Sequence, residues 1–361
     1  MIKVMLVDDS ALVRNALEEL FNRAPDIEVV ASAPDPFIAA DKLKRVVPDV
    51  ILLDVEMPKM DGLTFLRKLM NQHPIPVIIC STLVGDNSTT HIQALELGAV
   101  DIIQKPKIGL RQFVEQHQQY FFDVVRAAAQ SRLKPLIKRV QAREKHNADV
   151  ILPSGGRRAM HETTEKLIII GASTGGTEAI KTVLMGMPSD CPAIAIVQHM
   201  PEGFTKSFAA RLDSLCQINV REATDNMSLL RGHAVIAPGN MHMMIRRSGA
   251  RYMVQLQDGP PVSRHKPSVD VLMRSAANYV GSNAVGIILT GMGDDGAAGL
   301  LEMREAGAHT IGQDETSSVV YGMPKEAYKK GAVVQQLPLE RICAAALKEA
   351  AIESQSTPAP E

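Results

Sequence analysis

The sequence predicts an α/β protein of two domains, each built on a parallel β-sheet with helices on both faces. Short apolar runs rich in β-branched residues alternate with segments whose apolar residues recur at helical spacing, in both halves of the chain. This alternation is typical of βαβ units. The length of 361 residues is also that of two domains, since one domain usually contains about 100 to 200 residues. Hydrophobic residues at 45% and charged residues at 22% exclude disorder across the whole chain.

The first domain is predicted to cover residues 1–126. The segment Ala11–Phe21 has apolar residues at helical spacing, and comparable segments separate the other strands. Five βα repeats in this length predict a flavodoxin-like, doubly wound domain, which binds ligands beyond the carboxyl ends of its strands. The predicted strands are Ile2–Val7, Glu28–Ala31, Val50–Leu53, Val77–Cys80 and Val100–Ile103.

Residues 127–165 are predicted to form a linker, partly helical, that breaks at Pro153–Gly156. Basic residues outnumber acidic ones in this segment. Two interpretations of that charge remain open at this stage. It either keeps the linker solvated or docks it on an acidic surface of a neighbouring domain.

The second domain is predicted to cover residues 166–353 and to contain a doubly wound parallel sheet. Its first strand, Leu167–Ile170, is a continuous apolar run, as expected for a strand buried on both faces. A helix is predicted near Leu339–Ala351, and residues 354–361 are expected to be a disordered tail. The other predicted strands are Ala193–Val197, Ala234–Ala237 and Val285–Leu289.

Composition argues against several classes of protein. The formal net charge is -1, aromatic residues are 4% and Trp is absent, whereas nucleic-acid binders usually carry a positive excess and stacking aromatics. The N-terminus reaches acidic residues before a signal-peptide core can develop, and no apolar run approaches the ~20 residues of a membrane helix. We therefore expect a cytoplasmic protein that is not inserted in a membrane. The four cysteines have no metal-ligand spacing and are expected to be reduced core thiols.

Charged and hydroxyl side chains end successive strands of the first domain. Asp8 and Asp9 follow the first strand and Asp54 follows the third. Clustered carboxylates repel one another unless a cation lies among them, and Mg²⁺ prefers such oxygen ligands. Ser81 and Lys105 end the fourth and fifth strands. Three acids, a hydroxyl and a lysine at one rim indicate a site that accepts a phosphoryl group on a carboxylate.

These residues resemble the response-regulator receiver domains. The resemblance implies phosphorylation of Asp54, Mg²⁺ held by Asp8, Asp9, Asp54 and the backbone carbonyl of Glu56, and detection of the phosphoryl group by Ser81 and Lys105. A new dianionic group beside a lysine is able to bias a two-state element. The motifs that carry the resemblance are Asp8-Asp9, Asp54 within Leu-Leu-Asp-Val-Glu-Met-Pro, Asp61-Gly62, Ser81 and Lys105-Pro106.

The second domain opens with a strand followed by a glycine-rich turn, Gly171-Ala-Ser-Thr-Gly-Gly. The turn fits a phosphate-cradling loop, because helix N-terminal amides favour anions. It also fits G-x-S-x-G, which exposes a serine near amides that can hold an oxyanion. His199 follows the second strand, and Asp294 and Asp295 lie in a glycine-rich loop after a third. Together, Ser173, His199 and one of these acids supply a nucleophile, a general base and an orienting acid.

The second domain resembles the catalytic domain of the CheB-type chemotaxis methylesterases, which are protein-glutamate methylesterases/protein-glutamine glutaminases. With the receiver in front, the resemblance covers almost the full length outside the linker and tail. The motifs, in order along the chain, are Gly-Ala-Ser173-Thr-Gly-Gly, Gln-His199-Met-Pro, Ala237-Pro-Gly-Asn-Met-His242, His265-Lys-Pro-Ser-Val-Asp270 and Gly291-Met-Gly-Asp-Asp295-Gly.

The resemblance implies hydrolysis of γ-glutamyl methyl esters on methyl-accepting chemoreceptors, and often deamidation of receptor glutamines. A chemotaxis histidine kinase is the implied phosphodonor, and the esterase chemistry is implied to need no cofactor. The implied catalytic residues are Ser173, His199 and Asp295. Asp294 stands where the family often has Asn, which leaves its role open. Residues implied to donate to the oxyanion or to support the site are Thr174 and Met292, through their amides, and His242 and His265.

Three other functions agree less well with this sequence than an esterase does. A non-catalytic binding module has no need of a nucleophile, base and acid together. A nucleotide-binding domain that uses Gly171–Gly176 lacks an acidic ribose partner about 20 residues downstream, where only Asp190 precedes the next strand. A DNA-binding output domain disagrees with the near-neutral charge and with the lack of a helix-turn-helix pattern. The family also predicts that the unphosphorylated receiver covers the catalytic cleft.

Overall fold

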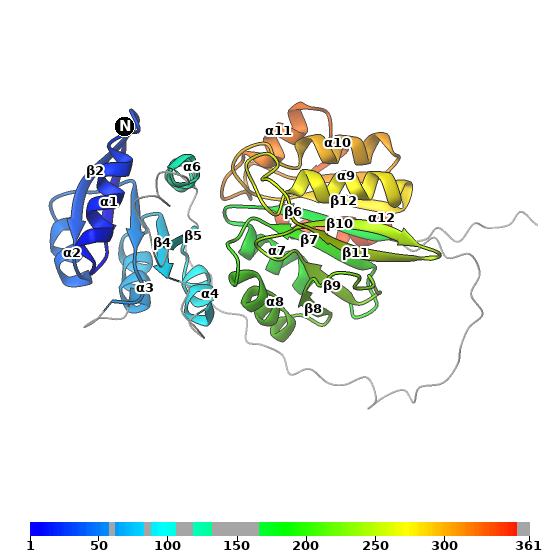
Figure 1. Cartoon of the computed structure of the whole chain (residues 1–361), viewed down its shortest axis with the longest axis horizontal. Coiled ribbons are helices and arrows are strands. Elements are labelled where there is room, and N and C mark those ends of the chain that lie inside the picture. Colours follow the sequence, from blue (N-terminus) through cyan, green and yellow to red (C-terminus); the bar gives the residue numbers. More distant parts are fainter. Residues whose placement is uncertain (58–61, 83–87, 106–117, 132–165, 352–361) are drawn as a thin grey trace, which may run out of the picture.

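The computed structural model describes residues 1–57, 62–82, 88–105, 118–131 and 166–351. The predicted linker beyond residue 131, with its break at Pro153–Gly156, and the predicted tail at 354–361 lie outside the described residues. Figure 1 shows two α/β bodies, an N-terminal one in blue to cyan and a C-terminal one in green to red.

The N-terminal body is a parallel sheet in the order β2-β1-β3-β4-β5, with helices on both faces. Its order is that of flavodoxin-like domains. Helix α1 begins after Ser10, whose side chain accepts from the Val13 amide, and buries Leu17, Leu20 and Phe21. The strands are β1 (Ile2–Val7), β2 (Ile27–Ala33), β3 (Val50–Leu53), β4 (Val77–Thr82) and β5 (Asp101–Lys105), and the helices are α1 (Ala11–Phe21), α2 (Pro36–Leu43), α3 (Gly62–Gln72), α4 (Ser88–Glu96) and α6 (Gln118–Ala129).

The C-terminal body has a larger parallel sheet, in the order β14-β13-β12-β6-β7-β9-β8. The chain leaves β6 towards β7 on one side and later returns to β12 on the other side, so the strand order reverses at the β6/β12 junction. In such sheets ligands bind at this switch point, beyond the carboxyl ends of the strands. The strands are β6 (Leu167–Ala172), β7 (Ala193–Gln198), β8 (Asn219–Glu222), β9 (His233–Ile236), β12 (Ala284–Ile288), β13 (His309–Gln313) and β14 (Gln335–Leu337).

Helices cover both faces of this sheet, and an antiparallel hairpin projects from the body (Figure 1). The hairpin packs against α9, the helix that follows it in the chain. The hairpin strands are β10 (His242–Ser248) and β11 (Arg251–Gln257), and the helices are α7 (Gly176–Met185), α8 (Phe204–Leu215), α9 (Val269–Tyr279), α10 (Ala297–Glu305), α11 (Met323–Lys329) and α12 (Leu339–Ala350), with a short 3-10 turn at Gly281–Asn283.

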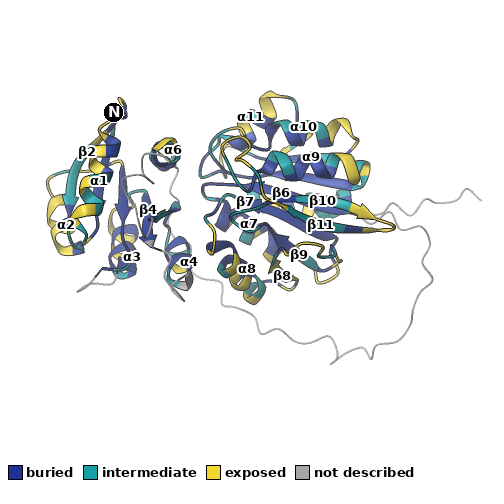
Figure 2. Ribbon diagram, in the orientation of Figure 1, coloured by how far each residue is buried: buried dark blue, intermediate teal, exposed yellow. Residues whose placement is uncertain are grey.

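The central strands of both sheets are buried, as Figure 2 shows by their dark blue colour, whereas the edge strand β2 is mostly half-buried and exposed residues line the outer helix surfaces. The predicted α/β fold class is confirmed, with a flavodoxin-like strand order in the first body and a doubly wound parallel sheet in the second. None of the four cysteines forms a disulfide bond within the described residues, and three of them are buried. Among the described helices, none combines the length and apolar character needed to span a bilayer.

The two bodies pack against each other through α4, β5 and α6 of the first. Helix α4 contacts α7 and α8 of the second. The buried Phe204 ring, at the start of α8, meets the His91 ring edge-on at 5.0 Å between centroids. Polar contacts across this interface join Thr174 Oγ1 to Asp101 Oδ2 at 2.8 Å, Arg211 Nε to Glu96 Oε1 at 2.7 Å and Arg264 Nη1 to Asp123 Oδ2 at 3.3 Å.

Candidate active site and phosphorylation site

Ser173 lies directly after β6, at the switch point of the larger sheet. Its amide donates to the Thr290 carbonyl at 3.0 Å, which ties it to the loop that follows β12. Its carbonyl accepts from Gln198 Nε2 at 2.9 Å and from the Gly176 amide at 2.7 Å. The serine is therefore held from three directions, and it remains 9% exposed.

Glycines allow the chain to approach Ser173 closely. A Cβ atom on Gly291 would lie 2.7 Å from Ser173 Cβ, a distance that real Cβ atoms essentially never show. Gly175 has a φ of 76°, in the left-handed region, and it turns the chain from the serine into α7. The two glycines therefore serve different purposes. Gly291 lets its loop approach Ser173 closely, and Gly175 adopts a left-handed backbone conformation.

His199 and Asp295 are joined by a hydrogen bond of 2.8 Å between Nε2 and Oδ2. Asp295 is 1% exposed and lies in the loop after β12. Burial acts to raise the pKa of Asp295, but the His199 hydrogen bond and charge, with backbone amides, outweigh burial and hold the pKa below its ordinary value. An ionised acid is therefore fixed against the histidine ring.

The N-terminus of α9 supplies the other donors to Asp295. Ser268 Oγ donates to Oδ1 at 2.8 Å, the Val269 amide to Oδ2 at 2.8 Å and the Asp270 amide to Oδ1 at 2.9 Å. Helix N-termini favour anions because their first amides lack intrahelical acceptors. Ser268 was not singled out from the sequence, although it lies in the quoted motif His265-Lys-Pro-Ser-Val-Asp270.

With Nε2 bound to Asp295, Nδ1 is the ring nitrogen of His199 left to accept a proton. In the described part of the chain Nδ1 has no hydrogen-bond partner, and no hydrogen bond joins His199 to Ser173. Catalytic hydrogen bonds often tighten only when substrate binds. The arrangement therefore brings a base to the serine's pocket without the serine-to-histidine bond being formed.

The predicted oxyanion donors flank the serine. Thr174 and Met292 lie in the loops after β6 and β12. Within the described ranges, no acceptor is bonded to either amide. Free amides on two converging loops are able to stabilise an oxyanion.

The three remaining residues singled out from the sequence, Asp294, His242 and His265, have different surroundings. Asp294 is exposed and makes no hydrogen bond to His199 within the described residues, whereas Asp295 does. His242 is buried, with Nε2 on the Pro260 carbonyl at 2.9 Å and Nδ1 accepting from the Ser268 amide at 3.2 Å, so it supports the donors of Asp295. His265 stacks on the His199 ring.

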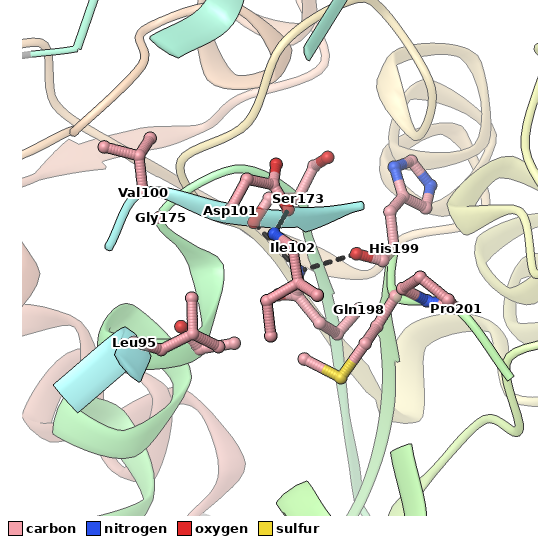
Figure 3. A pocket seen from close by; sticks show the side chains of 11 residues that line it. Leu95, Val100, Asp101, Ile102, Ser173, Gly175, Gln198, His199 and Pro201 are labelled. Atoms are coloured by element: carbon pink, nitrogen blue, oxygen red, sulfur yellow. Dashed lines mark hydrogen bonds between the residues drawn. The ribbon is translucent and has the colours of Figure 1, made fainter. Parts of the chain in front are cut away.

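The pocket at the serine is lined by both bodies (Figure 3). Ser173, Gln198 and His199 come from the second, and Leu95 and Asp101 from the first. Burial raises the pKa of Asp101 to about 6, although the hydrogen bond from Thr174 opposes the shift. No motif pointed to Asp101, because its position here depends on how the two bodies pack.

The acidic cluster of the first body is assembled as predicted from the strand ends. Lys105 Nζ donates to Asp54 Oδ2 at 2.7 Å and also pairs with Asp8. Burial raises the pKa of Asp8, although Lys105 opposes the shift. Asp54 Oδ1 accepts from the Glu56 amide at 2.9 Å, and Ser81 is fully buried at the end of β4.

The donor set of this cluster fits a hard divalent cation. One ligand oxygen from each of Asp8, Asp9 and Asp54 lies within 4.8 Å of the others, and Asp9 is exposed to solvent. Mg²⁺ is held by a few carboxylates and keeps waters and phosphate oxygens as its other ligands. The residues present therefore match the predicted cation site.

Comparison with known proteins agrees with both sites. The family model for CheB methylesterase matches residues 168–346, and the model for the response regulator receiver domain matches residues 4–118. A protein-glutamate methylesterase/protein-glutamine glutaminase of Geobacter metallireducens is 57% identical over 349 residues, covering 96% of this chain and 98% of the relative. A protein of the same name from Oleidesulfovibrio alaskensis is 56% identical over 348 residues, with the same coverage.

A solved structure agrees as well. The crystal structure of the Thermotoga maritima CheB methylesterase catalytic domain is 35% identical, with a TM-score of 0.50, and covers 51% of this chain and 97% of that one. The two relatives share more than half of their aligned residues with this chain over nearly the whole length of both proteins. The two family models match successive parts of the chain, the receiver first and the methylesterase second. The chain belongs to the CheB methylesterase family, as a member with an N-terminal response-regulator receiver domain.

Proposed function

We propose that this member of the methylesterase family demethylates γ-glutamyl methyl esters on methyl-accepting chemoreceptors, deamidates receptor glutamines, and is controlled by phosphorylation of its receiver. The observation that carries the proposal is the meeting of Ser173, His199 and Asp295 at the switch point of one sheet. The substrates are cytoplasmic receptor domains, and the enzyme acts there.

The proposed reaction follows the serine-hydrolase scheme. Ser173 Oγ attacks the ester carbonyl while His199 Nδ1 takes the hydroxyl proton, and the Thr174 and Met292 amides bind the oxyanion. Collapse breaks the bond to methoxide, which leaves as methanol with the proton from His199. Water then attacks the acyl-enzyme, with His199 again as base, and releases the receptor glutamate and free Ser173. Ammonia takes the place of methanol when a glutamine is the substrate.

The proposed control begins at Asp54. Asp8, Asp9, Asp54 and the Glu56 carbonyl hold Mg²⁺, which when bound neutralises charge on the incoming phosphoryl group. A chemotaxis histidine kinase is the proposed phosphodonor. Lys105, already paired with Asp54, and the buried Ser81 respond to the new phosphoryl oxygens.

The receiver is proposed to inhibit the unphosphorylated enzyme by covering the site. Support comes from Asp101 and Leu95 of the receiver, which line the serine's pocket, and from the Asp101 hydrogen bond to Thr174. We assign residues 1–126 to the receiver, 127–165 to the linker, 166–353 to the catalytic domain and 354–361 to a tail.

Methanol release from methylated chemoreceptor membranes tests the chemistry. We expect phosphorylated wild-type protein to release methanol and Ser173→Ala to lose at least about 10³-fold in rate, because it lacks the nucleophile. Ser214→Ala, a serine on the outer side of α8 whose hydroxyl only donates to the Arg211 carbonyl, is the matched control and should retain the wild-type rate. Unchanged release by Ser173→Ala would overturn the assignment of the nucleophile, whereas no release by folded, phosphorylated wild type would overturn the proposal and favour a binding module.

A further inference from the structure

Two parallel imidazole rings lie at the candidate active site. We propose that His265 is a positioning residue for the general base: its ring stacks on His199 and holds that ring in the plane in which Nε2 meets Asp295. The inference rests on the roles proposed for Ser173, His199 and Asp295. It adds His265, which would act on the reaction through His199 and not by touching the substrate.

The stacking geometry is close and well aligned. The ring centroids of His199 and His265 are 3.7 Å apart, and the planes differ by 3°. His199 follows β7, while His265 lies in the segment between β11 and α9. One face of the base is thus covered by a ring from a different part of the chain, while its edge is bound by Asp295.

The chain segment around His265 is built to present its ring. Val262 and His265 exchange two backbone hydrogen bonds, at 3.0 and 2.9 Å. Between them, Ser263 and Arg264 have φ values of 49° and 69°, in the left-handed region that non-glycine residues rarely adopt. Ser263 Oγ also donates to Asp270 Oδ2 at 3.0 Å, which ties the turn to the helix that supports Asp295.

The His265 ring is held in its neutral form. Its Nδ1 lies 2.8 Å from the Ser263 carbonyl, an acceptor only, so Nδ1 carries the hydrogen. Burial, reinforced by the charge of a protonated His199, lowers the pKa of His265 to about 3. The charged or titratable groups around the pair are Asp295 on its edge, Asp101 across the pocket and the exposed Arg264 beside it. A proton taken from the serine therefore remains on His199.

A metal site built from the same residues is a poorer interpretation. Ligand atoms of His199, His265 and Asp295 lie within 4.8 Å of one another. A ring nitrogen binds a metal along a lone pair that lies in the ring plane. Lone pairs of two stacked, parallel rings run in parallel planes and do not converge on one ion, and His199 Nε2 is already bound to Asp295.

The substitution His265→Ala removes the covering ring and leaves His199 free to rotate away from its plane. A small misplacement of a catalytic group costs up to about 10²-fold in rate. We therefore expect kcat to fall by about 10- to 100-fold and KM to change less than about twofold, because His265 does not need to bind the substrate. His265→Phe keeps a flat ring that stacks, and should restore kcat to within about fivefold of wild type.

His233→Ala is the matched control. Its Nδ1 lies 2.9 Å from the carbonyl of the residue two positions earlier, as in His265, but within the described residues its ring stacks on no other. It should retain the wild-type kcat and KM. The three variants, wild type and Ser173→Ala are measured as phosphorylated full-length protein by methanol release, with thermal unfolding of each.

The outcomes separate the inference from the proposed function. A drop in kcat for His265→Ala, rescued by His265→Phe, supports the positioning role. A wild-type kcat for His265→Ala, or an equal loss in both His265 variants at unchanged melting temperature, overturns it, because stacking would then not be the property that matters. Activity in Ser173→Ala overturns the proposed function instead, whatever the His265 variants do.

Discussion

At the residue scale, two adjacent acids in one loop have different surroundings. Asp295 is buried and accepts from His199, Ser268 and two amides of α9, whereas Asp294 is exposed. The contacts that lower the pKa of Asp295 are those that orient the base. The sequence left Asp294 as a competitor, and the hydrogen bonds of the described residues single out Asp295.

Asparagine substitutions at these two positions test the assignment. Asp295→Asn removes the charge that faces His199 and favours the wrong ring tautomer, so kcat should fall by about 10³- to 10⁴-fold. Asp294→Asn should lie within about twofold of wild type. Methanol release with phosphorylated protein measures both. Equal losses in the two variants, or a larger loss for Asp294→Asn, would contradict the assignment.

The residues of the triad were predictable because each follows a buried strand, and the carboxyl ends of parallel strands meet at one edge of the sheet. The same reasoning assembled Asp8, Asp54 and Lys105. The contact of His265 with His199 was not predictable, because a turn with left-handed residues brings the two rings together. Asp101 was missed because its contact crosses between the two bodies.

At the element scale, strand β5 joins the two sites. It begins with Asp101, which accepts from Thr174 beside the catalytic serine, and ends with Lys105, which binds Asp54. In the proposed control, a shift of Lys105 towards a new phosphoryl group would act on the strand that also carries Asp101. The strand is therefore the element through which we expect phosphorylation to reach the catalytic pocket.

The raised pKa of Asp101 makes this contact sensitive to pH. Burial raises the pKa of Asp101 to about 6 from an ordinary 3.8 in the packed arrangement, and separation of the two bodies would expose the side chain that faces Thr174. The packed arrangement therefore binds a proton more tightly than the open one. Acid favours packing, this advantage is lost as pH rises from about 4 to 6, and little changes above about pH 7.

Asp101→Asn removes the ionisation while keeping an acceptor for Thr174. We expect the basal activity of wild type relative to Asp101→Asn to be near 1 at about pH 4 and to rise severalfold by pH 7, because only the wild type places a charge at this position. Taking the ratio at each pH cancels the titration of the catalytic base. A ratio that is flat with pH, or that falls, would show that Asp101 does not control packing.

Secondary structure was predictable where strands are continuously apolar. Strands β1 and β3 match their predicted bounds, and β6, β7, β9 and β12 lie within two residues of theirs. Strands β8, β13 and β14 were missed because they are short or rich in polar residues, and β10 and β11 because they form a hairpin outside the sheet. Leu12, one of the apolar residues at helical spacing within Ala11–Phe21, is 73% exposed.

At the scale of the whole molecule, the receiver covers part of the pocket that contains the serine. Its α4 packs on α7 and α8, and polar contacts flank this core at Glu96 and Asp123. Each exposed ion pair of this kind contributes little to the stability of the interface. The closed arrangement is thus held chiefly by apolar packing and the Asp101 contact, which suits a reversible block.

Removal of the receiver tests the block. Deleting residues 1–158 should raise basal methanol release by about tenfold, equivalent to a coupling of roughly 1.4 kcal/mol. The catalytic domain of the Thermotoga maritima relative was crystallised on its own, which makes the deletion practical. Circular dichroism is used first to check that the shortened protein is folded. Equal or lower turnover by a folded truncation would rule out inhibition by the receiver.

The most direct test of the account is methanol release with and without a small-molecule phosphodonor and Mg²⁺, for wild type and Asp54→Ala. The central claim is that phosphorylation at Asp54 controls hydrolysis at Ser173. We predict that the phosphodonor stimulates wild type and has no effect on Asp54→Ala, while both proteins retain basal activity. Stimulation that persists in Asp54→Ala, or a folded and phosphorylated wild type that is not stimulated, would contradict the account.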